Sequence, residues 1–445
     1  MDRSGRDLLV AVRRGAGSLR AQLEEQLRDD VRAGRLRPGK ALPSTRVLAR
    51  DLGVSRGVVV EAYAQVAAEG LIVTLPGGTT RVAPPARVEP LGPPGPSVRW
   101  DFRVESGDLG AFPRRAWLAA LGRALATAPD AALSYGDRAG APVLREALAG
   151  YLGRARGVVA DPARLVITAG ATQGVALLAR VLVARGVRRM AVERPGFPLH
   201  AALLARAGVE VVGVPVDDEG LVVDALPSGV GAVLVTPAHQ FPMGVTLSAA
   251  RRAALLARDL LVIEDDYDGE FGFDDGPAGS LQGRAPERVA YLGSASKALV
   301  PGLRLGWAVL PGELAVALTE EKTLADGGSP VLEQLALADL IGRGDLDRHL
   351  RRVRARHRRR RDALVTAVAE ELPGARLSGA HAGLHAIADL GPGHDVPALL
   401  ARAWTRGVGV VGFEHERRAI LVLGWANAPE PSIAPGLREL ARAVA

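Results

Sequence analysis

The stretch Gly293-Ser-Ala-Ser-Lys297, followed seven residues later by Arg304, lies directly after the apolar run Val289 to Leu292. Lys297 is one of only three lysines in a chain with 53 arginines. Arginine cannot replace a lysine that must attack a carbonyl group, because a guanidinium stays protonated and is not nucleophilic. Small hydroxyl residues, a lysine and an arginine at a strand end suit an aldehyde cofactor that carries a phosphate. The stretch therefore predicts such a cofactor site, with an exposed loop lysine as the alternative.

A pair of acidic residues follows the continuous apolar strand Leu260 to Glu264. Such strands between helical stretches are typical of a parallel sheet buried on both faces, and ligands bind beyond the carboxyl ends of its strands. Asp265 and Asp266 fall at that edge, followed by Tyr267. A carboxylate beneath a pyridine nitrogen keeps the nitrogen protonated, which makes Asp265 a candidate for that role. A solvated loop or a helix cap is the other interpretation of the acidic pair.

Three more segments offer groups for the same site. The run Leu165-Val-Ile-Thr-Ala-Gly170-Ala-Thr172 predicts a strand, a small-residue turn and a helix start, where backbone N–H groups bind anions. Phe197 follows the next strand and could stack on a ring, although core packing is the usual role of a phenylalanine. His239 and Gln240 follow the strand Ala232 to Val235 and offer polar side chains to a phenolic oxygen.

In their order and spacing these motifs resemble those of a fold-type I aminotransferase dependent on pyridoxal 5'-phosphate (PLP). The resemblance extends from about Trp100 to the end of the chain. It implies that Lys297 holds the cofactor covalently and that Asp265 is the partner of the pyridine nitrogen. Around the ring it places Tyr267 at the phenolic oxygen, with Gln240 or His239 nearby, and Phe197 as the stacking residue.

The same resemblance implies a phosphate cup and a homodimer. In such dimers a tyrosine in the position of Tyr135 reaches the phosphate bound by the partner subunit. The cup within one subunit would consist of Gly170, Ala171, Thr172, Ser294 and Arg304.

The carboxyl-terminal motif departs from the family's pattern. Those enzymes carry an arginine in a Leu-Arg-Leu-Gly-like run that binds the substrate carboxylate, whereas this chain reads Leu421-Val422-Leu423-Gly424. Arg417 and Arg418 lie nearby, and Arg418 is the candidate replacement, with a charged loop before a strand as the alternative. The departure leaves open which ligand binds and whether turnover occurs.

Residues 1–83 carry the pattern of a small helical domain followed by a hairpin. Ser44 is the expected N-cap of a short second helix, and the tight turn Gly53-Val-Ser55 precedes a third helix from Arg56 to Gly70. Strands from Leu71 to Leu75 and from Thr79 to Val82 complete a winged helix-turn-helix. A first helix is predicted by an apolar stripe at a spacing of four residues, made of Leu19, Leu23, Leu27 and Val31.

This segment closely resembles the GntR-type winged helix over about residues 17–83. The match includes Leu42-Pro-Ser-Thr-Arg46 and Leu52-Gly-Val-Ser-Arg56. Residues 1–83 hold 14 basic and 9 acidic side chains, so +5 of the chain's net charge of +7 lies there, as expected for a domain that binds a polyanion. The resemblance implies contacts with double-stranded operator DNA from Arg46, Ser55, Arg56, Gly77 and Gly78.

The composition predicts three parts. Residues 84–99 are rich in proline and glycine and form a linker between the winged helix of residues 1–83 and the aminotransferase-like domain of residues 100–445. The expected fold class is α/β, with a mostly parallel sheet and a small C-terminal α+β subdomain. The 445 residues include no cysteine, which excludes disulfides, and the motifs assign no residue to a metal. No signal peptide or membrane span is evident, so we expect a cytoplasmic protein.

A GntR-type DNA-binding domain joined by a linker to an aminotransferase-like domain is similar to the MocR/GabR family of regulators. The resemblance implies a homodimer that binds PLP and operator DNA and senses a small amine, an amino acid or PLP. One alternative is a catalytically active aminotransferase with an appended DNA-binding domain. The other is a sensor of PLP that has no amine ligand.

Overall fold

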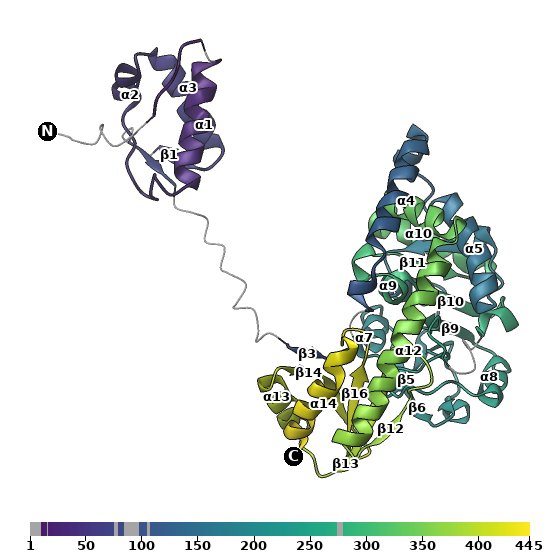
Figure 1. The fold of residues 1–445 in the computed structure, drawn as a ribbon. Coiled ribbons are helices and arrows are strands. Elements are labelled where there is room, and N and C mark those ends of the chain that lie inside the picture. Colours follow the sequence, from purple (N-terminus) through teal and green to yellow (C-terminus); the bar gives the residue numbers. More distant parts are fainter. Residues whose placement is uncertain (1–9, 16, 75–78, 84–97, 105–106, 274–278) are drawn as a thin grey trace. The chain divides into compact units, whose positions relative to one another are not determined.

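The computed structural model describes residues 1–445 except 1–9, 16, 75–78, 84–97, 105–106 and 274–278. The chain forms two compact units, Met1–Gly95 and Pro96–Ala445 (Figure 1). Their boundary falls inside the predicted linker, of which residues 84–97 lie outside the described part of the chain.

Unit 1 is a three-helix domain with a two-stranded antiparallel wing. Its core is formed by the inner faces of the helices, where Leu23, Leu27, Val59 and Val66 are fully buried. The Ser44 hydroxyl caps the second helix by accepting a hydrogen bond from the N–H of Val47, as the sequence predicted. The elements are α1 (Leu19–Arg32), α2 (Thr45–Leu52), α3 (Arg56–Ala68), β1 (Ile72–Thr74) and β2 (Thr80–Val82).

Unit 2 contains an eight-stranded sheet in the order β4-β11-β10-β9-β8-β5-β6-β7. The neighbours β10 and β9, β9 and β8, β8 and β5, and β5 and β6 are parallel, which confirms the α/β class with a mainly parallel sheet. The strands are β4 (Leu165–Thr168), β5 (Arg189–Arg194), β6 (Glu210–Asp217), β7 (Gly220–Leu221), β8 (Ala232–Val235), β9 (Leu261–Asp266), β10 (Val289–Ser294) and β11 (Gly306–Val309).

Helices cover both faces of this sheet, because alternate side chains of each strand point to opposite sides. One face packs against α6 (Ala171–Ala184), α7 (Pro198–Arg206) and α10 (Gly312–Asp326). The other packs against α5 (Pro142–Arg156), α8 (Ala249–Leu256) and α11 (Val331–Gly342). Helix α4 (Arg114–Thr127) packs on α11.

The C-terminal part of unit 2 is an α+β subdomain, as predicted. It has a four-stranded antiparallel sheet in the order β12-β13-β16-β15, which shares one apolar core with the surrounding helices. The strands are β12 (Arg376–Ser378), β13 (His385–Pro392), β15 (Val411–His415) and β16 (Arg418–Gly424), and the helices are α12 (Asp345–Glu371), α13 (Val396–Thr405) and α14 (Glu430–Val444). A short parallel pair joins β14 (Val408–Gly409) to β3 (Trp100–Asp101).

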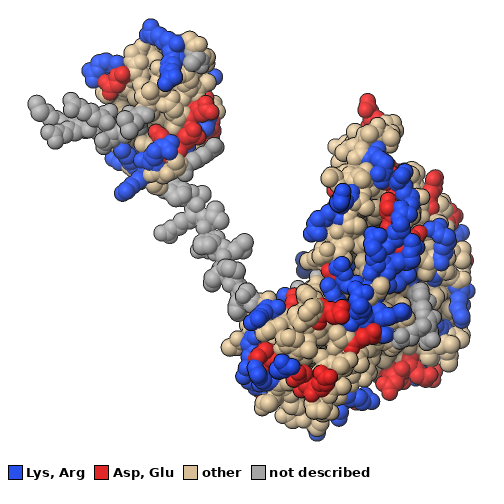
Figure 2. Space-filling model, in the orientation of Figure 1, with Lys and Arg blue, Asp and Glu red and all other residues tan. Residues whose placement is uncertain are grey.

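Arginine side chains gather over the long helix α12 (Figure 2). Arg351, Arg352, Arg358 and Arg359 are exposed, so the basic run of the sequence forms a solvated helix face. Among the helices of the described residues, none combines the length and the apolar character needed to cross a bilayer.

Candidate cofactor site and DNA-binding face

Lys297 lies just beyond the end of β10, in the short helix α9 (Ala295–Ala298). Its side chain is half-buried, and Nζ donates a hydrogen bond of 2.9 Å to the carbonyl oxygen of Val104. Strand β10 pairs in parallel with β9, and Leu292 lies opposite Asp265 in the register. The structure therefore brings the predicted lysine and the predicted acid to the same edge of the sheet.

Asp265 is buried and has one oxygen paired and one oxygen without a partner. Oδ2 lies 3.0 Å from Nε2 of His200, whereas Oδ1 has no hydrogen-bond partner among the described residues. A buried acceptor without a donor is costly, and a protonated pyridine nitrogen is a donor that would satisfy it. Asp265 thus fits the role that the sequence predicted for it.

His200, the partner of Asp265, was not among the residues predicted from the sequence. It lies in the first turn of α7, three residues after Phe197, and its side chain is buried. The order of residues gave no sign of this contact, because 65 positions separate the histidine from the aspartate. Only the packing of α7 on the face of the sheet that carries Asp265 brings them together.

Asp266 belongs to a different cluster on the opposite face of β9. Arg156 donates two hydrogen bonds to its carboxylate, of 2.7 and 3.0 Å, and the hydroxyl of Tyr291 donates a third of 2.7 Å. All three side chains are buried. Asp266 is therefore fully engaged within the protein and leaves Asp265 as the acid that is open to a cofactor.

A cup for an anion is built where α6 begins. Gly170, the N-cap of α6, has a φ of 98°, and a Cβ atom built there would lie 3.1 Å from Nη2 of Arg304. Arg304 itself has a φ of 50° and donates a hydrogen bond of 2.5 Å to the carbonyl of Ala169. A glycine N-cap leaves the helix N-terminus without a side-chain cap, next to a guanidinium, and this combination suits a phosphate.

The remaining cup residues lie on the same edge. Ala171 is the first residue of α6, and Thr172 is exposed in its first turn. Ser294 lies opposite Gly306, which lies opposite Thr168 at the end of β4, so three strand ends meet here. The Ser294 hydroxyl donates to Oγ of Ser296 at 2.8 Å. The hydrogen-bond donors at this edge and the space left by Gly170 together fit the phosphate of PLP.

The predicted ring contacts form one aromatic group. Phe197 is 41% exposed, and its ring meets the rings of His200 and Phe241 edge-on at centroid distances of 5.1 and 5.5 Å. Tyr267 donates a hydrogen bond of 3.0 Å to the carbonyl of His239. Burial raises the pKa of the Tyr267 phenol well above its usual value, with the carboxylates of Asp268 and Asp265 adding to the effect.

Gln240 is held by protein groups. Its amide donates to Oε2 of Glu193 at 3.2 Å and to the carbonyl of Pro195 at 2.9 Å, and its oxygen accepts from the N–H of Met243. Glu193 also accepts hydrogen bonds from the N–H and the hydroxyl of Thr236, and burial raises its pKa to about 7. Gln240 therefore shapes the loop after β8, and Glu193 is a positioning residue that sequence reasoning missed.

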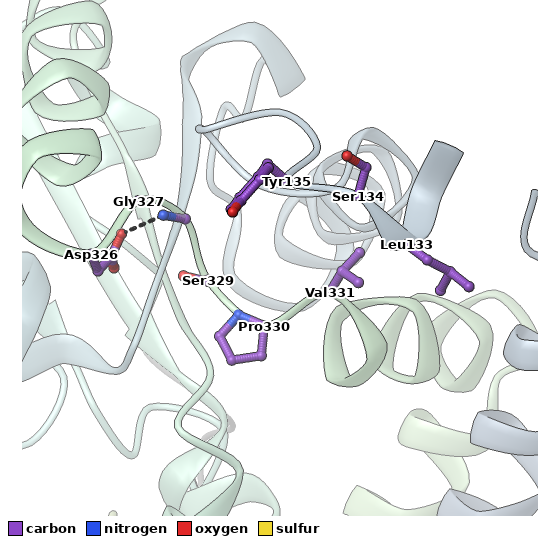
Figure 3. A pocket seen from close by; sticks show the side chains of 9 residues that line it. Leu133, Ser134, Tyr135, Asp326, Gly327, Ser329, Pro330 and Val331 are labelled. Atoms are coloured by element: carbon purple, nitrogen blue, oxygen red, sulfur yellow. Dashed lines mark hydrogen bonds between the residues drawn. The ribbon is translucent and has the colours of Figure 1, made fainter. Parts of the chain in front are cut away.

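Tyr135 stands apart from these groups. It is 84% exposed and lines a pocket of about 440 Å³ between residues 133–135 and the segment 326–331 (Figure 3). The guanidinium of Arg138 lies 5.4 Å from the centroid of its ring. This exposure agrees with a side chain that meets a partner subunit.

Arg418 is not brought to the site. Its Nε donates to both oxygens of Asp389, at 3.0 and 2.8 Å, at the outer end of β16. Val422 lies four residues further along the strand, about 13 Å away, in a cluster with Val104 and Phe241. Asp389 thus engages the guanidinium of Arg418, and apolar side chains surround Val422.

The predicted DNA contacts lie around the start of α3. Arg46, Ser55 and Arg56 are all exposed, and Ser55 is the N-cap of α3 without a side-chain capping bond. Nε of Arg56 lies 3.4 Å from the hydroxyl of Thr45, which joins the starts of α2 and α3. The wing-tip residues Gly77 and Gly78 lie outside the described residues.

Two family models match the chain. The model "Aminotransferase class I and II" matches residues 103–414, and the model "Bacterial regulatory proteins, gntR family" matches residues 19–82. The chain belongs to the aminotransferase class I and II family and carries a gntR-family domain before it. The aminotransferase fold implies dependence on PLP.

Individual relatives agree with this assignment. The chain is 34% identical over 448 residues to the HTH-type pyridoxine biosynthesis transcriptional regulator PdxR of Corynebacterium glutamicum, covering 96% of both chains. It is 32% identical over 389 residues to the probable rhizopine catabolism regulatory protein MocR of Rhizobium meliloti, covering 80% of this chain and 78% of MocR. An archaeal alanine:glyoxylate aminotransferase structure matches with 28% identity and a TM-score of 0.72, over 78% of this chain and 90% of the enzyme. The chain is thus an HTH-type transcriptional regulator with an aminotransferase-like domain, which confirms the MocR-type resemblance.

Proposed function

We propose that this regulator binds PLP through Lys297 and that its aminotransferase-like unit senses a small amine, an amino acid or PLP itself. Binding there would change how the winged helix binds operator DNA. The observation that carries the proposal is the buried Oδ1 of Asp265, which lies at the same sheet edge as Lys297 and has no hydrogen-bond partner in the part of the chain that the structure describes. Buried acceptors in folded proteins almost always have a donor, and the protonated ring nitrogen of PLP would be the donor for Oδ1 of Asp265.

Each residue of the site has a distinct task in this proposal. When bound, PLP supplies an aldehyde for covalent attachment and a ring that withdraws electrons. Lys297 provides the amine, and Asp265 holds a proton at the ring nitrogen. His200 fixes the orientation of Asp265, and Arg304 with the N-terminus of α6 neutralises the phosphate.

Sensing is favoured over transamination by the surroundings of Val422. Transamination needs a substrate held by its carboxylate, so that a base can move a proton at a fixed distance. The side chain at position 422 is apolar and fully buried beside Ile387 and Ile420, and Arg418 is engaged by Asp389. A ligand can still react with the aldehyde in such a site, but it is not clamped for repeated turnover.

We further propose that the chain acts as a homodimer in the cytoplasm, where operator DNA is found. The exposed Tyr135 and the apolar side chains Leu118 and Leu324, which are 71% and 85% exposed, support a subunit interface in unit 2. A two-fold dimer would present two winged helices to two half-sites of the operator.

The test is an absorbance titration of the purified full chain. PLP is added first, followed by alanine, glutamate or putrescine, while keto-acid or aldehyde product is assayed in parallel. A shift of the cofactor band with at most one product per subunit supports a sensor, and many turnovers support the enzyme. A chain that shows no PLP band, or the same band when Lys297 is replaced by alanine, would contradict the proposal.

A further inference from the structure

Three buried side chains converge beside Tyr267, and their ligand atoms lie within 4.8 Å of one another. His239 comes from the loop after β8, Asp268 from the loop after β9 and His385 from the start of β13. Their exposed fractions are 1%, 1% and 0%. We propose that these three residues form a site for one divalent transition-metal ion of the Zn²⁺ class.

Both imidazole rings are oriented as metal ligands are. Nε2 of His239 donates to the carbonyl of Gly379 at 3.3 Å, and Nε2 of His385 donates to the carbonyl of Pro242 at 3.1 Å. Histidines that bind metals usually donate their second ring N–H to a backbone carbonyl or a carboxylate, which fixes the ring and its tautomer. In this tautomer each Nδ1 presents a lone pair to the cluster.

A proton alone does not satisfy the cluster. Nδ1 of His239 lies 3.0 Å from Oδ2 of Asp268. An additional proton on this nitrogen would therefore form a hydrogen bond with that one oxygen. Oδ1 of Asp268 and Nδ1 of His385 would still lack a partner among the described residues. A divalent cation accepts lone pairs from all three side chains at once and balances the buried carboxylate.

A glycine makes room for the cluster. Gly383 has a φ of +67°, and a Cβ atom built there would lie 1.9 Å from Nδ1 of His239 and 2.5 Å from Oδ2 of Asp268. The backbone can pass this close to both ligand atoms only without a side chain.

The ligand set selects the class of ion. Two imidazole nitrogens and one carboxylate oxygen suit Zn²⁺ and related ions, whereas Mg²⁺ prefers oxygen ligands and keeps its waters. Bonds of about 2.1 Å in a tetrahedral arrangement place ligand atoms about 3.4 Å apart, so small side-chain rotations are sufficient. The hydroxyl of Tyr267 lies 3.3 Å from Nδ1 of His239, so the ion would lie next to a residue of the proposed cofactor site.

The experiment measures zinc binding to the full chain without a polyhistidine tag. Metal is removed by a chelating resin, and Zn²⁺ is then titrated against a fluorescent zinc chelator, with Mg²⁺ in a parallel titration. We expect one Zn²⁺ per chain and no competition from Mg²⁺. His385→Gln and Asp268→Asn should each weaken zinc binding at least about tenfold, whereas the control His394→Gln, in the turn before α13, should not change it.

A second measurement does not depend on how the variants fold. X-ray absorption at the zinc edge of the loaded wild-type chain should show only nitrogen and oxygen ligands, including two imidazoles. No uptake of Zn²⁺ at micromolar free concentration would overturn the proposal. So would unchanged affinity in both variants, or an absorption spectrum without imidazole scattering.

Discussion

Asp265 and Asp266 are neighbours in the chain but serve opposite faces of β9. Asp265 pairs with His200 at 3.0 Å and has a second oxygen that no described residue bonds. Asp266, in contrast, is bonded twice by Arg156 and once by Tyr291. The alternation of side chains along a strand separates the two carboxylates although their sequence context is the same. One carboxylate keeps an oxygen that no described residue bonds, and the other is bonded within the protein on both oxygens.

The first prediction compares the two aspartates directly. Asp266→Asn should destabilise unit 2 by about 3–5 kcal/mol, because it leaves the Arg156 guanidinium buried without its counter-charge. Asp265→Asn should unfold at nearly the wild-type denaturant concentration but bind PLP about 10–100-fold more weakly, since a charge-assisted hydrogen bond is lost. Urea unfolding and PLP titration measure both effects. The opposite pattern would mean that Asp266 faces the cofactor.

The second prediction concerns the covalent link. Borohydride treatment of the PLP-loaded chain should fix the cofactor to the peptide that contains Lys297, as peptide mapping by mass spectrometry would show. Lys297→Ala should still fold and retain PLP without the covalent link, because Arg304 and the start of α6 remain to hold the phosphate. Lys322 is the internal control, since it is buried and bonded to Asp326 at 3.0 Å. Label on Lys322 or Lys40 would rule out the assignment.

Much of this site could be predicted because it lies where strands end. The apolar runs that predicted β8, β9 and β10 also predicted that the residues after them share one edge of the sheet. Local pattern alone therefore predicted that Lys297 and Asp265 follow neighbouring strand ends, and the register of β9 and β10 brings them to one edge of the sheet. The winged helix could be predicted for a similar reason, since its helices, cap and hairpin follow one another in a short segment.

The contacts that could not be predicted all join distant segments of the chain. His200 meets Asp265 only when α7 has packed on the sheet, and Glu193 reaches Gln240 across two neighbouring strand ends. Arg418 looked available in the sequence because nothing there showed that Asp389, on the adjacent strand β13, would take its guanidinium. Local spacing carries no information on these pairings, which depend on strand register and helix packing.

The third prediction is a pH dependence that arises from Glu193. Burial raises its pKa from 4.5 to about 7, against the opposing hydrogen bonds from Thr236 and Gln240. The folded state thus binds the proton more tightly than the unfolded state, so this stabilisation is complete below pH 4.5 and is lost as the pH rises through 7. Glu193→Gln cannot ionise. Its free energy of unfolding should match the wild type at low pH and exceed it by about 3 kcal/mol above pH 7.

Urea unfolding of the cofactor-free chain between pH 5 and pH 8 measures this difference. Glu320→Gln, an exposed position on α10, is the matched control and should show no growing difference with pH. A constant offset between Glu193→Gln and the wild type across the whole range would show that the carboxyl does not titrate there.

The last prediction places the winged helix on DNA. Arg56 and Arg46 are exposed at the starts of α3 and α2, so replacing either with alanine should remove a contact with DNA. Loss of a phosphate contact weakens binding to all sequences and lowers the salt slope by about one unit. Loss of a bidentate base contact costs about 1–3 kcal/mol and relaxes the preference at one position of each half-site.

Fluorescence anisotropy on DNA from the regulator's own promoter region, across a salt series, separates these outcomes. Arg343→Ala, an exposed arginine at the end of α11, removes the same charge and should leave binding unchanged. Binding that is independent of salt, or unaffected when Arg46 and Arg56 are both replaced, would show that this face of unit 1 does not contact DNA.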